Sequence, residues 1–161
     1  RTGREYGSPM RIIEAVEAVN ERQKEIVVRK LAAELGDLRG RTVALWGLAF
    51  KPETDDMREA PALVAIDRLT CAGAVVRVYD PAAMDECRRR VGDAVVYCSD
   101  MYEAVVDADA LVLLTEWKQF RLPSWTVIRK VMANPLVIDG RNIYDKAELV
   151  AEGFTYKAIG K

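Results

Sequence analysis

From residue 41 onward, short apolar runs alternate with segments of helical pattern, and this alternation constrains the fold more than any other sequence feature. Apolar runs without internal polar alternation are typical of parallel strands that are covered on both faces. We expect strands at 42–46, 75–79, 94–97, 110–115, 136–138 and 154–156. We expect helices between them at 61–72, 82–90, 99–106, 124–132 and 145–151. The sequence therefore predicts an α/β fold with a doubly wound sheet.

A long helix is expected before the sheet, over residues 8–35. Ser8 and Pro9 supply an N-cap and a first helical residue, and Gly36 supplies the stop. At 1.5 Å per residue this helix would be roughly 40 Å long, which is longer than a small domain covers. We expect it to pack either against a preceding domain or in a dimer interface. The predicted fold class is thus a mostly parallel, Rossmann-like α/β sheet preceded by a long N-terminal helix.

Composition excludes several classes of function. The chain has 161 residues, of which half are hydrophobic and 30% are charged, and its net charge is −1. So small a net charge gives no global attraction to nucleic acid or to an anionic membrane, and the apolar runs are too short to span a bilayer. Histidine is absent, which removes Ser-His-Asp catalysis and every metal site that contains histidine. We expect no nucleic-acid, membrane or metal partner.

The three cysteines form an odd set without C-x-x-C spacing, so neither a disulfide framework nor a zinc site is expected. Cys71 and Cys98 are predicted to be small core residues, and Cys87 is predicted to be more exposed. No signal-peptide pattern is present, and a reducing cytoplasm is the expected location.

The loop after the first strand carries the chemistry at the carboxyl edge of the predicted sheet, where doubly wound folds bind ligands. Gly47 stands alone there, without the G-x-G-x-x-G pattern that cradles a dinucleotide pyrophosphate. Two cations, Lys51 and Arg58, follow instead and suit phosphate recognition. Spacing alone slightly favours another interpretation, in which Asp55 and Asp56 neutralise these cations and help to cap the next helix.

Other polar residues end strands at the same edge, namely Asp80, Thr115, Glu116, Asp139, Gly140 and Arg141. If the strand order is 3-2-1-4-5, the first and fifth strands lie two spacings apart, roughly 10 Å. Cations from both strands then reach one elongated anion. Asp80 has the position of a ribose-binding acid, but Asp-Pro is also ordinary turn chemistry, which is the favoured interpretation. Trp117, Phe120 and Trp125 are expected to be buried rather than stacked on a base.

Three ordered segments resemble one family. The stretch G-L-A-F-K-P-E-T-D-D-M-R-E-A-P at 47–61 resembles the C-terminal domain signature of the UDP-glucose/GDP-mannose dehydrogenase family. T-E-W-K-Q-F-R at 115–121 and I-D-G-R-N at 138–142 match two further family segments, and A-V-N at 18–20 resembles the end of the family's central helical domain. The resemblance spans essentially the whole chain. Within the family it is strongest to the members that oxidise UDP-glucose.

The resemblance implies an enzyme with three domains of different function. Such enzymes bind NAD in an N-terminal Rossmann domain, dimerise through a central helical domain and bind the UDP-sugar in a C-terminal domain. They oxidise the sugar C6 alcohol to a carboxylate in two NAD-dependent steps. Residues 1–38 would then end the dimerisation domain of a homodimer, and 39–161 would bind UDP-glucose or a related UDP-sugar. The chain starts at Arg1 and lacks both the dinucleotide motif and the G-G-x-C-F-x-x-D segment of the catalytic cysteine. We therefore expect a C-terminal fragment with no catalytic residue of its own, inactive alone.

The same resemblance assigns roles to four residues. Phe50 and Lys51 are expected to contact the UDP-sugar, Lys51 through its charge, and Arg141 is expected at the substrate as well. Arg58 is expected to reach NAD bound by the preceding domain. For the three cations this outweighs the structural interpretation, whereas Phe50 is equally suited to anchor the loop. Two alternatives stay open: the same domain of a related UDP-N-acetylhexosamine or GDP-mannose dehydrogenase, and a stand-alone nucleotide-binding or dimerisation module.

Overall fold

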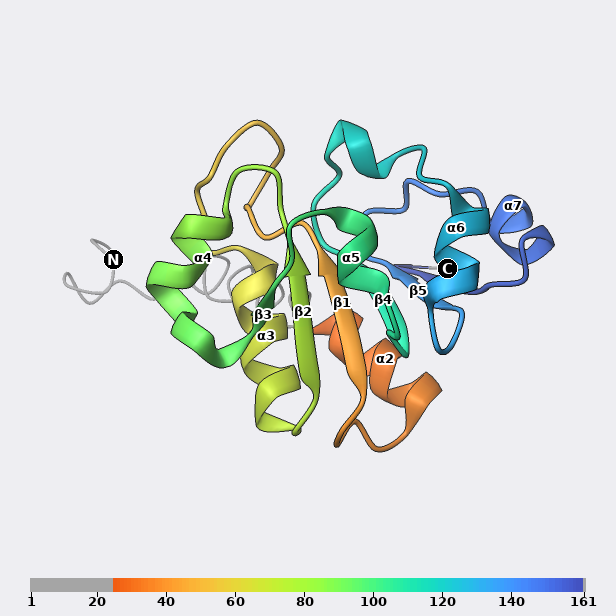
Figure 1. The fold of residues 1–161 in the computed structure, drawn as a ribbon, viewed down its shortest axis with the longest axis horizontal. Coiled ribbons are helices and arrows are strands. Elements are labelled where there is room, and N and C mark those ends of the chain that lie inside the picture. Colours follow the sequence, from red (N-terminus) through yellow and green to blue (C-terminus); the bar gives the residue numbers. More distant parts are fainter. Residues whose placement is uncertain (1–24, 161) are drawn as a thin grey trace, which may run out of the picture.

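Six strands form one parallel sheet in the computed structural model, which describes residues 25–160 (Figure 1). They are β1 (Thr42–Trp46), β2 (Val75–Tyr79), β3 (Val96–Tyr97), β4 (Ala110–Leu113), β5 (Leu136–Asp139) and β6 (Thr155–Ala158). Their order in the sheet is β3-β2-β1-β4-β5-β6, and every neighbouring pair is parallel. The predicted α/β class and the predicted order of the first five strands are confirmed, and β6 extends the sheet beside β5.

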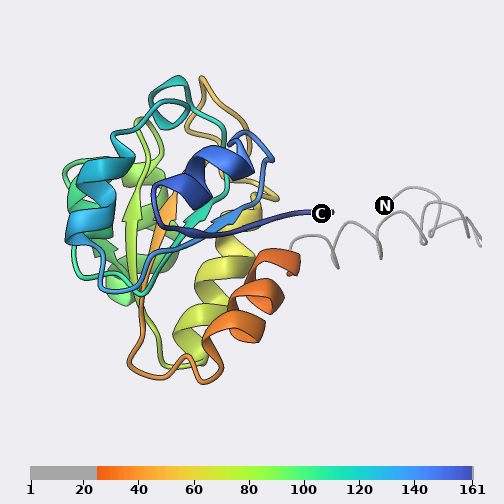
Figure 2. The same ribbon diagram turned by 90° about the vertical axis from the view of Figure 1, so that its right-hand side faces the viewer.

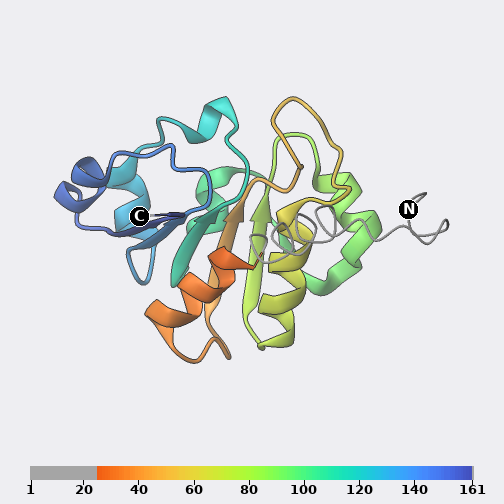
Figure 3. The same cartoon turned by 180° about the vertical axis from the view of Figure 1, so that it is seen from behind.

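Helices connect the strands and cover the sheet. They are α2 (Ile26–Leu35), α3 (Pro61–Cys71), α4 (Met84–Val91), α5 (Met101–Val105), α6 (Trp125–Val131) and α7 (Lys146–Ala151), with short 3₁₀ turns η2 (Gly92–Ala94) and η3 (Lys118–Phe120). Figure 2 shows α2 and α3 on one side of the sheet and α6 on the other. Seen from behind in Figure 3, α2 and α3 lie side by side across the strands. The sheet is therefore buried between two helical layers, which explains why its strands are almost uniformly apolar.

Aspartate side chains cap two of the helices, one of them a residue later than predicted. Asp145 accepts the backbone N–H of Glu148 and caps α7, as predicted. The helix predicted from Ser99 begins one residue later, because the Asp100 carboxylate accepts two backbone N–H groups at its first turn. Ser99 instead donates its N–H and its hydroxyl to the Glu103 carboxylate.

The described part of the predicted N-terminal helix packs on the sheet. Helix α2 ends where predicted, because Gly36 adopts φ +70° and its N–H bonds to the Ala32 carbonyl. Val27 and Leu31 are its buried residues, and the helix lies against β5 and α3. Residues 8–24 of the prediction, with the proposed start at Ser8, lie outside the described residues.

The core confirms the aromatic prediction and reverses part of the cysteine prediction. Phe120 is fully buried and stacks on Trp46, with ring centroids 5.1 Å apart. Cys98 is buried as expected, but Cys87 is buried and Cys71 is exposed. Cys71 is the last residue of α3, whose buried face is formed by other positions, whereas Cys87 is the only buried residue of the short α4. Burial raises the pKa of the Cys87 and Cys98 thiols, so both stay protonated near neutral pH.

Between residues 25 and 160, no helix is long and apolar enough to cross a membrane. The same range contains no group of three or more cysteine or acidic side chains arranged to hold a metal ion.

Candidate ligand-binding site

The loops that follow β1, β4 and β5 meet at the carboxyl edge of the sheet, at the top of Figure 1. Strand β1 lies between β2 and β4, so the chain leaves β1 toward one half of the sheet and later returns to build the other half. This is the topological switch point, and the crevice above it is where sheets of this type bind ligands.

Gly47 brings the first two of these loops together. Its φ is +88°, and a Cβ at this position would lie 2.5 Å from Thr115 Cβ and 2.6 Å from the Thr115 backbone nitrogen. The Thr115 hydroxyl in turn donates a hydrogen bond of 2.5 Å to the Ala49 carbonyl. The isolated glycine is thus required by close approach of the β4 connection, and the structure gives it no role as a phosphate cradle.

Asp80, at the end of β2, is 1% exposed and holds three connections at once. Its Oδ2 atom accepts the N–H groups of Leu48 (2.7 Å) and Ala49 (3.1 Å) and the indole N–H of Trp117 (3.1 Å), and its Oδ1 atom accepts the N–H groups of Ala82 and Ala83 (both 2.8 Å). The bonds to residues 82 and 83 confirm the turn interpretation. The burial leaves no accessible oxygen for a ribose hydroxyl.

Asp139, the last residue of β5, is fully buried and organises the loop that carries Arg141. Its carboxylate accepts the backbone N–H groups of Arg141, Asn142, Ile143 and Tyr144 and the hydroxyl of Tyr156, at 2.8–3.0 Å. Burial and the hydrogen bond to Asp139 raise the pKa of Tyr156, which keeps this hydroxyl a donor.

Arg141, in the loop after β5, contacts both the loop after β4 and the loop after β1. Its Nε donates to the Leu114 carbonyl at 2.7 Å and its Nη2 donates to the Phe50 carbonyl at 3.1 Å. Its Nε also lies 3.0 Å from Glu116 Oε2, and both side chains are about 30% exposed. That Glu116 oxygen is buried and accepts no hydrogen bond. The predicted substrate cation is therefore at the switch point, where it is partly neutralised by a glutamate that sequence reasoning left without a role.

Phe50 and Lys51 present their side chains outward from this supported loop. The Phe50 side chain is 50% exposed, and its backbone N–H bonds to the Asp56 carbonyl. Lys51 is exposed, and no acidic side chain among the described residues forms an ion pair with its ammonium group. The expected neutralisation of both cations by Asp55 and Asp56 does not extend to Lys51.

Arg58 differs from Lys51, because Asp56 holds it. The Asp56 carboxylate binds Arg58 Nε (3.0 and 3.1 Å) and Nη2 (2.8 Å), and this hydrogen bonding lowers the pKa of Asp56 to about 2. Arg58 remains 79% exposed. The pair borders an open polar hollow of about 420 Å³ that is lined by Thr54, Asp55, Asp56, Arg58, Glu86 and Arg90. The structure thus brings Arg141 into contact with the loop that carries Phe50 and Lys51, and it places Arg58 beside a hollow toward α4 that these three residues do not line.

A model of the UDP-glucose/GDP-mannose dehydrogenase family, UDP binding domain, matches residues 44–146. The chain is 48% identical over its whole length to the UDP-glucose 6-dehydrogenase of Pseudomonas aeruginosa and 42% identical to that of Rhizobium meliloti, and it covers 37% of each of these proteins. Among solved structures it is similar to a UDP-glucose dehydrogenase from Pyrobaculum islandicum, with a TM-score of 0.82 and 34% identity. The match covers 98% of this chain and 34% of that chain. It is also similar to an NDP-N-acetyl-D-galactosaminuronic acid dehydrogenase from Methanosarcina mazei Go1, with a TM-score of 0.73 and 32% identity. That match covers 87% of this chain and 29% of that chain. The chain therefore spans between 29% and 37% of the length of these four proteins.

Proposed function

Since the chain belongs to the UDP-glucose/GDP-mannose dehydrogenase family, we propose that it forms the UDP-binding part of a UDP-glucose 6-dehydrogenase. The whole enzyme oxidises C6 of UDP-glucose to the carboxylate in the cytoplasm. NAD, which accepts hydride in this chemistry, is held mainly by a part of the enzyme outside this chain. Residues 1–38 end a dimerisation domain, and residues 39–161 bind the nucleotide sugar.

The observation that carries this proposal is the meeting of Phe50, Lys51 and Arg141 at the switch point. Arg141 Nη2 bonds to the Phe50 carbonyl, so the two segments that the family resemblance singled out are in direct contact. Lys51 follows with an ammonium group that no described residue pairs. A point charge and a planar guanidinium carried by these two contacting segments suit the two phosphates of a diphosphate.

Each residue then has a distinct task. Lys51 and Arg141 bind the diphosphate by charge-assisted hydrogen bonds, and Phe50 offers an apolar surface to the UDP-sugar. Arg58 reaches toward NAD from the polar hollow. Its bond to Asp56 is exposed on both sides, and exposed ion pairs contribute little to stability, so a phosphate readily replaces the carboxylate.

Calorimetric titration of the chain with UDP, UDP-glucose and GDP tests the proposal. We expect both uridine nucleotides to bind more tightly than GDP. Lys51→Ala is expected to weaken UDP binding about tenfold, because one charge-assisted contact is lost. Lys130→Ala, which removes an exposed lysine on α6, is the matched control and is expected to bind as the wild type does. Equal binding by Lys51→Ala and wild type, or no uridine nucleotide binding at all, contradicts the proposal.

A further inference from the structure

The loop that presents Phe50 and Lys51 is held by one buried carboxylate. Asp80 Oδ2 accepts the N–H groups of Leu48 and Ala49, the two residues directly before Phe50. Asp80 lies 31 and 32 positions further along the chain, at the end of another strand. A carboxylate acceptor makes stronger hydrogen bonds than a neutral one, and it does so here with 1% of its residue exposed.

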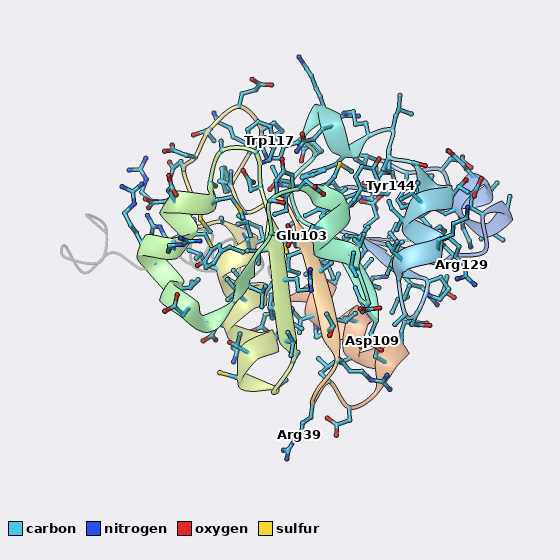
Figure 4. The ribbon with its side chains drawn as sticks, in the orientation of Figure 1. Arg39, Glu103, Asp109, Trp117, Arg129 and Tyr144 are labelled. Carbon is cyan, nitrogen blue, oxygen red and sulfur yellow. The ribbon has the colours of Figure 1, made fainter. Side chains whose placement is uncertain are left out.

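Trp117 connects the same oxygen to the loop after β4. Its indole N–H donates to Asp80 Oδ2 at 3.1 Å, and the side chain is 9% exposed. Figure 4 shows Trp117 at the carboxyl end of the sheet, above the strands. One carboxylate oxygen therefore fixes the β1 loop and the β4 connection relative to each other, while the other oxygen holds the turn after β2.

Two further side chains bond to the same stretch of loop backbone. Thr115 donates to the Ala49 carbonyl, and Arg141 donates to the Phe50 carbonyl. The backbone is thus bonded on both sides at residues 48–50, whereas the Phe50 ring is half exposed and Lys51 is exposed to solvent. Fixing a binding loop before the ligand arrives reduces the conformational entropy that binding would otherwise lose.

We propose that Asp80 and Trp117 form a positioning pair for ligand binding, a carboxylate–indole bridge that holds the β1–α3 loop where Phe50 and Lys51 meet the nucleotide sugar. The inference rests on the proposed function of those two side chains. Asp80 and Trp117 are positioning residues that act through the loop backbone, because both side chains are buried and neither is presented to a ligand.

Two variants and one control separate positioning from general stability. Asp80→Asn keeps the shape of the side chain but replaces one accepting oxygen by an amide group, and Trp117→Phe keeps an aromatic ring but removes the indole donor. Asp109→Asn is the control: Asp109 accepts from the Thr42 N–H and pairs with Arg41 at the opposite end of the sheet, where Figure 4 labels it. Each variant of the full chain is measured for thermal unfolding, for amide hydrogen exchange at Leu48 and Ala49, and for UDP affinity.

Asp80→Asn is expected to raise the Kd for UDP about tenfold and Trp117→Phe about threefold, each with faster exchange at Leu48 and Ala49. Asp109→Asn is expected to lower the melting temperature while the Kd for UDP and the exchange at both amides stay unchanged. If Asp80→Asn does not fold, Trp117→Phe carries the test.

The inference is overturned if both amides keep their protection in the variants, or if protection is lost while the Kd for UDP is unchanged. It is equally overturned if Asp109→Asn weakens UDP binding as much as Asp80→Asn does. If the wild type binds no uridine nucleotide, the proposed function fails, and the exchange rates still decide whether the bridge fixes the loop.

Discussion

Asp80 and Asp139 are alike in residue type, in position at the end of a strand and in near-complete burial, yet they hold the molecule together in different ways. Each carboxylate accepts five hydrogen bonds. Four donors of Asp139 lie within the next five residues of the chain. Three donors of Asp80 lie 31 to 37 positions away. One aspartate closes its own loop, and the other joins loops that the chain builds separately.

The difference matters because a local turn and a long-range bridge depend on different parts of the fold. The Asp139 loop satisfies its own backbone once β5 and β6 are paired, in the manner of an Asx turn. The Asp80 bridge needs β1, β2 and β4 in register at the same time. The loop that carries the exposed side chains of Phe50 and Lys51 is held by this long-range Asp80 bridge.

The largest effect on stability is expected when either buried aspartate, Asp80 or Asp139, is replaced by alanine. Asp80→Ala and Asp139→Ala are each expected to lower the free energy of unfolding by about 3–5 kcal/mol, because five donors lose a charged acceptor in a buried site. Urea unfolding measures this. Asp109→Ala, which removes an acceptor of only two bonds, is expected to lose about 1–2 kcal/mol. A loss as large at Asp109 as at the two buried aspartates would show that burial and bond number do not set the effect.

The glycines beside the two aspartate-held loops sharpen the comparison. Gly47→Ala places a Cβ 2.6 Å from the Thr115 backbone nitrogen and at a φ of +88°, so strain and collision add. Gly140→Ala meets only a collision, 2.5 Å from the Leu113 carbonyl oxygen. We expect losses of about 3 kcal/mol for Gly47→Ala and about 2 kcal/mol for Gly140→Ala in urea unfolding.

Gly92→Ala is the control for conformational strain alone, because its φ is +58° and no atom lies within 4 Å of the added Cβ. It is expected to lose about 1 kcal/mol. Equal losses at all three glycines would contradict the assignment of Gly47 to loop contact.

Glu116→Gln addresses the charge balance of the edge and has a smaller expected effect. It removes a negative charge 3.0 Å from Arg141 Nε without changing side-chain shape. UDP is expected to bind about two- to fivefold more tightly, since the partly exposed guanidinium then faces the diphosphate without a competing carboxylate. Glu34→Gln, which removes the partner of Lys157 instead, is the matched control. Unchanged or weaker UDP binding by Glu116→Gln would show that the glutamate does not oppose the ligand.

The smallest effect on stability is expected from Asp56, whose carboxylate pairs with Arg58 at the solvent-exposed surface rather than in the core. The hydrogen bonds of Arg58 hold the pKa of Asp56 at about 2, below its ordinary value of 3.8. A lowered pKa means that the ionised form is favoured in the folded state, so this contribution to stability is complete above about pH 4 and is lost as the pH falls toward 2. Carbon NMR titration of the Asp56 carboxyl group measures the midpoint. Arg58→Gln is expected to return the midpoint toward 3.8, and a midpoint that stays near 2 in this variant would show that Arg58 does not cause the lowered pKa.

What the sequence predicts well is local. Apolar runs define β1 and β2 at their observed ends, and their alternation with helices predicts the parallel order of the sheet. The loop at Asp139 is visible as D-G-R-N, because its donors follow within a few residues. The family resemblance adds Phe50, Lys51 and Arg141; Arg141 contacts the Phe50 carbonyl, and the roles of all three residues stay predictions.

The features that the sequence does not reveal are contacts between distant segments and the orientation of helices. The bond from Trp117 to Asp80 joins positions 37 apart, and no local pattern marks it beyond an aromatic residue after a strand. Cys71 and Cys87 exchange their expected exposures because they lie at the end of one helix and within another helix of only eight residues, where periodicity identifies no face. Asp56 pairs Arg58, as the structural interpretation predicts, and leaves it exposed, so contact between Arg58 and NAD stays a prediction.

The central position of β1 also has a consequence for folding, because β1 needs partners at two different distances along the chain. Val43 pairs on one side with Val76 and on the other with Ala110, and the second pairing closes a loop about twice as long as the first. Closing that longer loop loses more chain entropy before any contact compensates for it, which is typical of slow steps in parallel sheets. The crevice is therefore complete only once the last central strand has docked. A nucleotide that binds there acts on the finished sheet, so it slows unfolding and leaves the rate of folding unchanged.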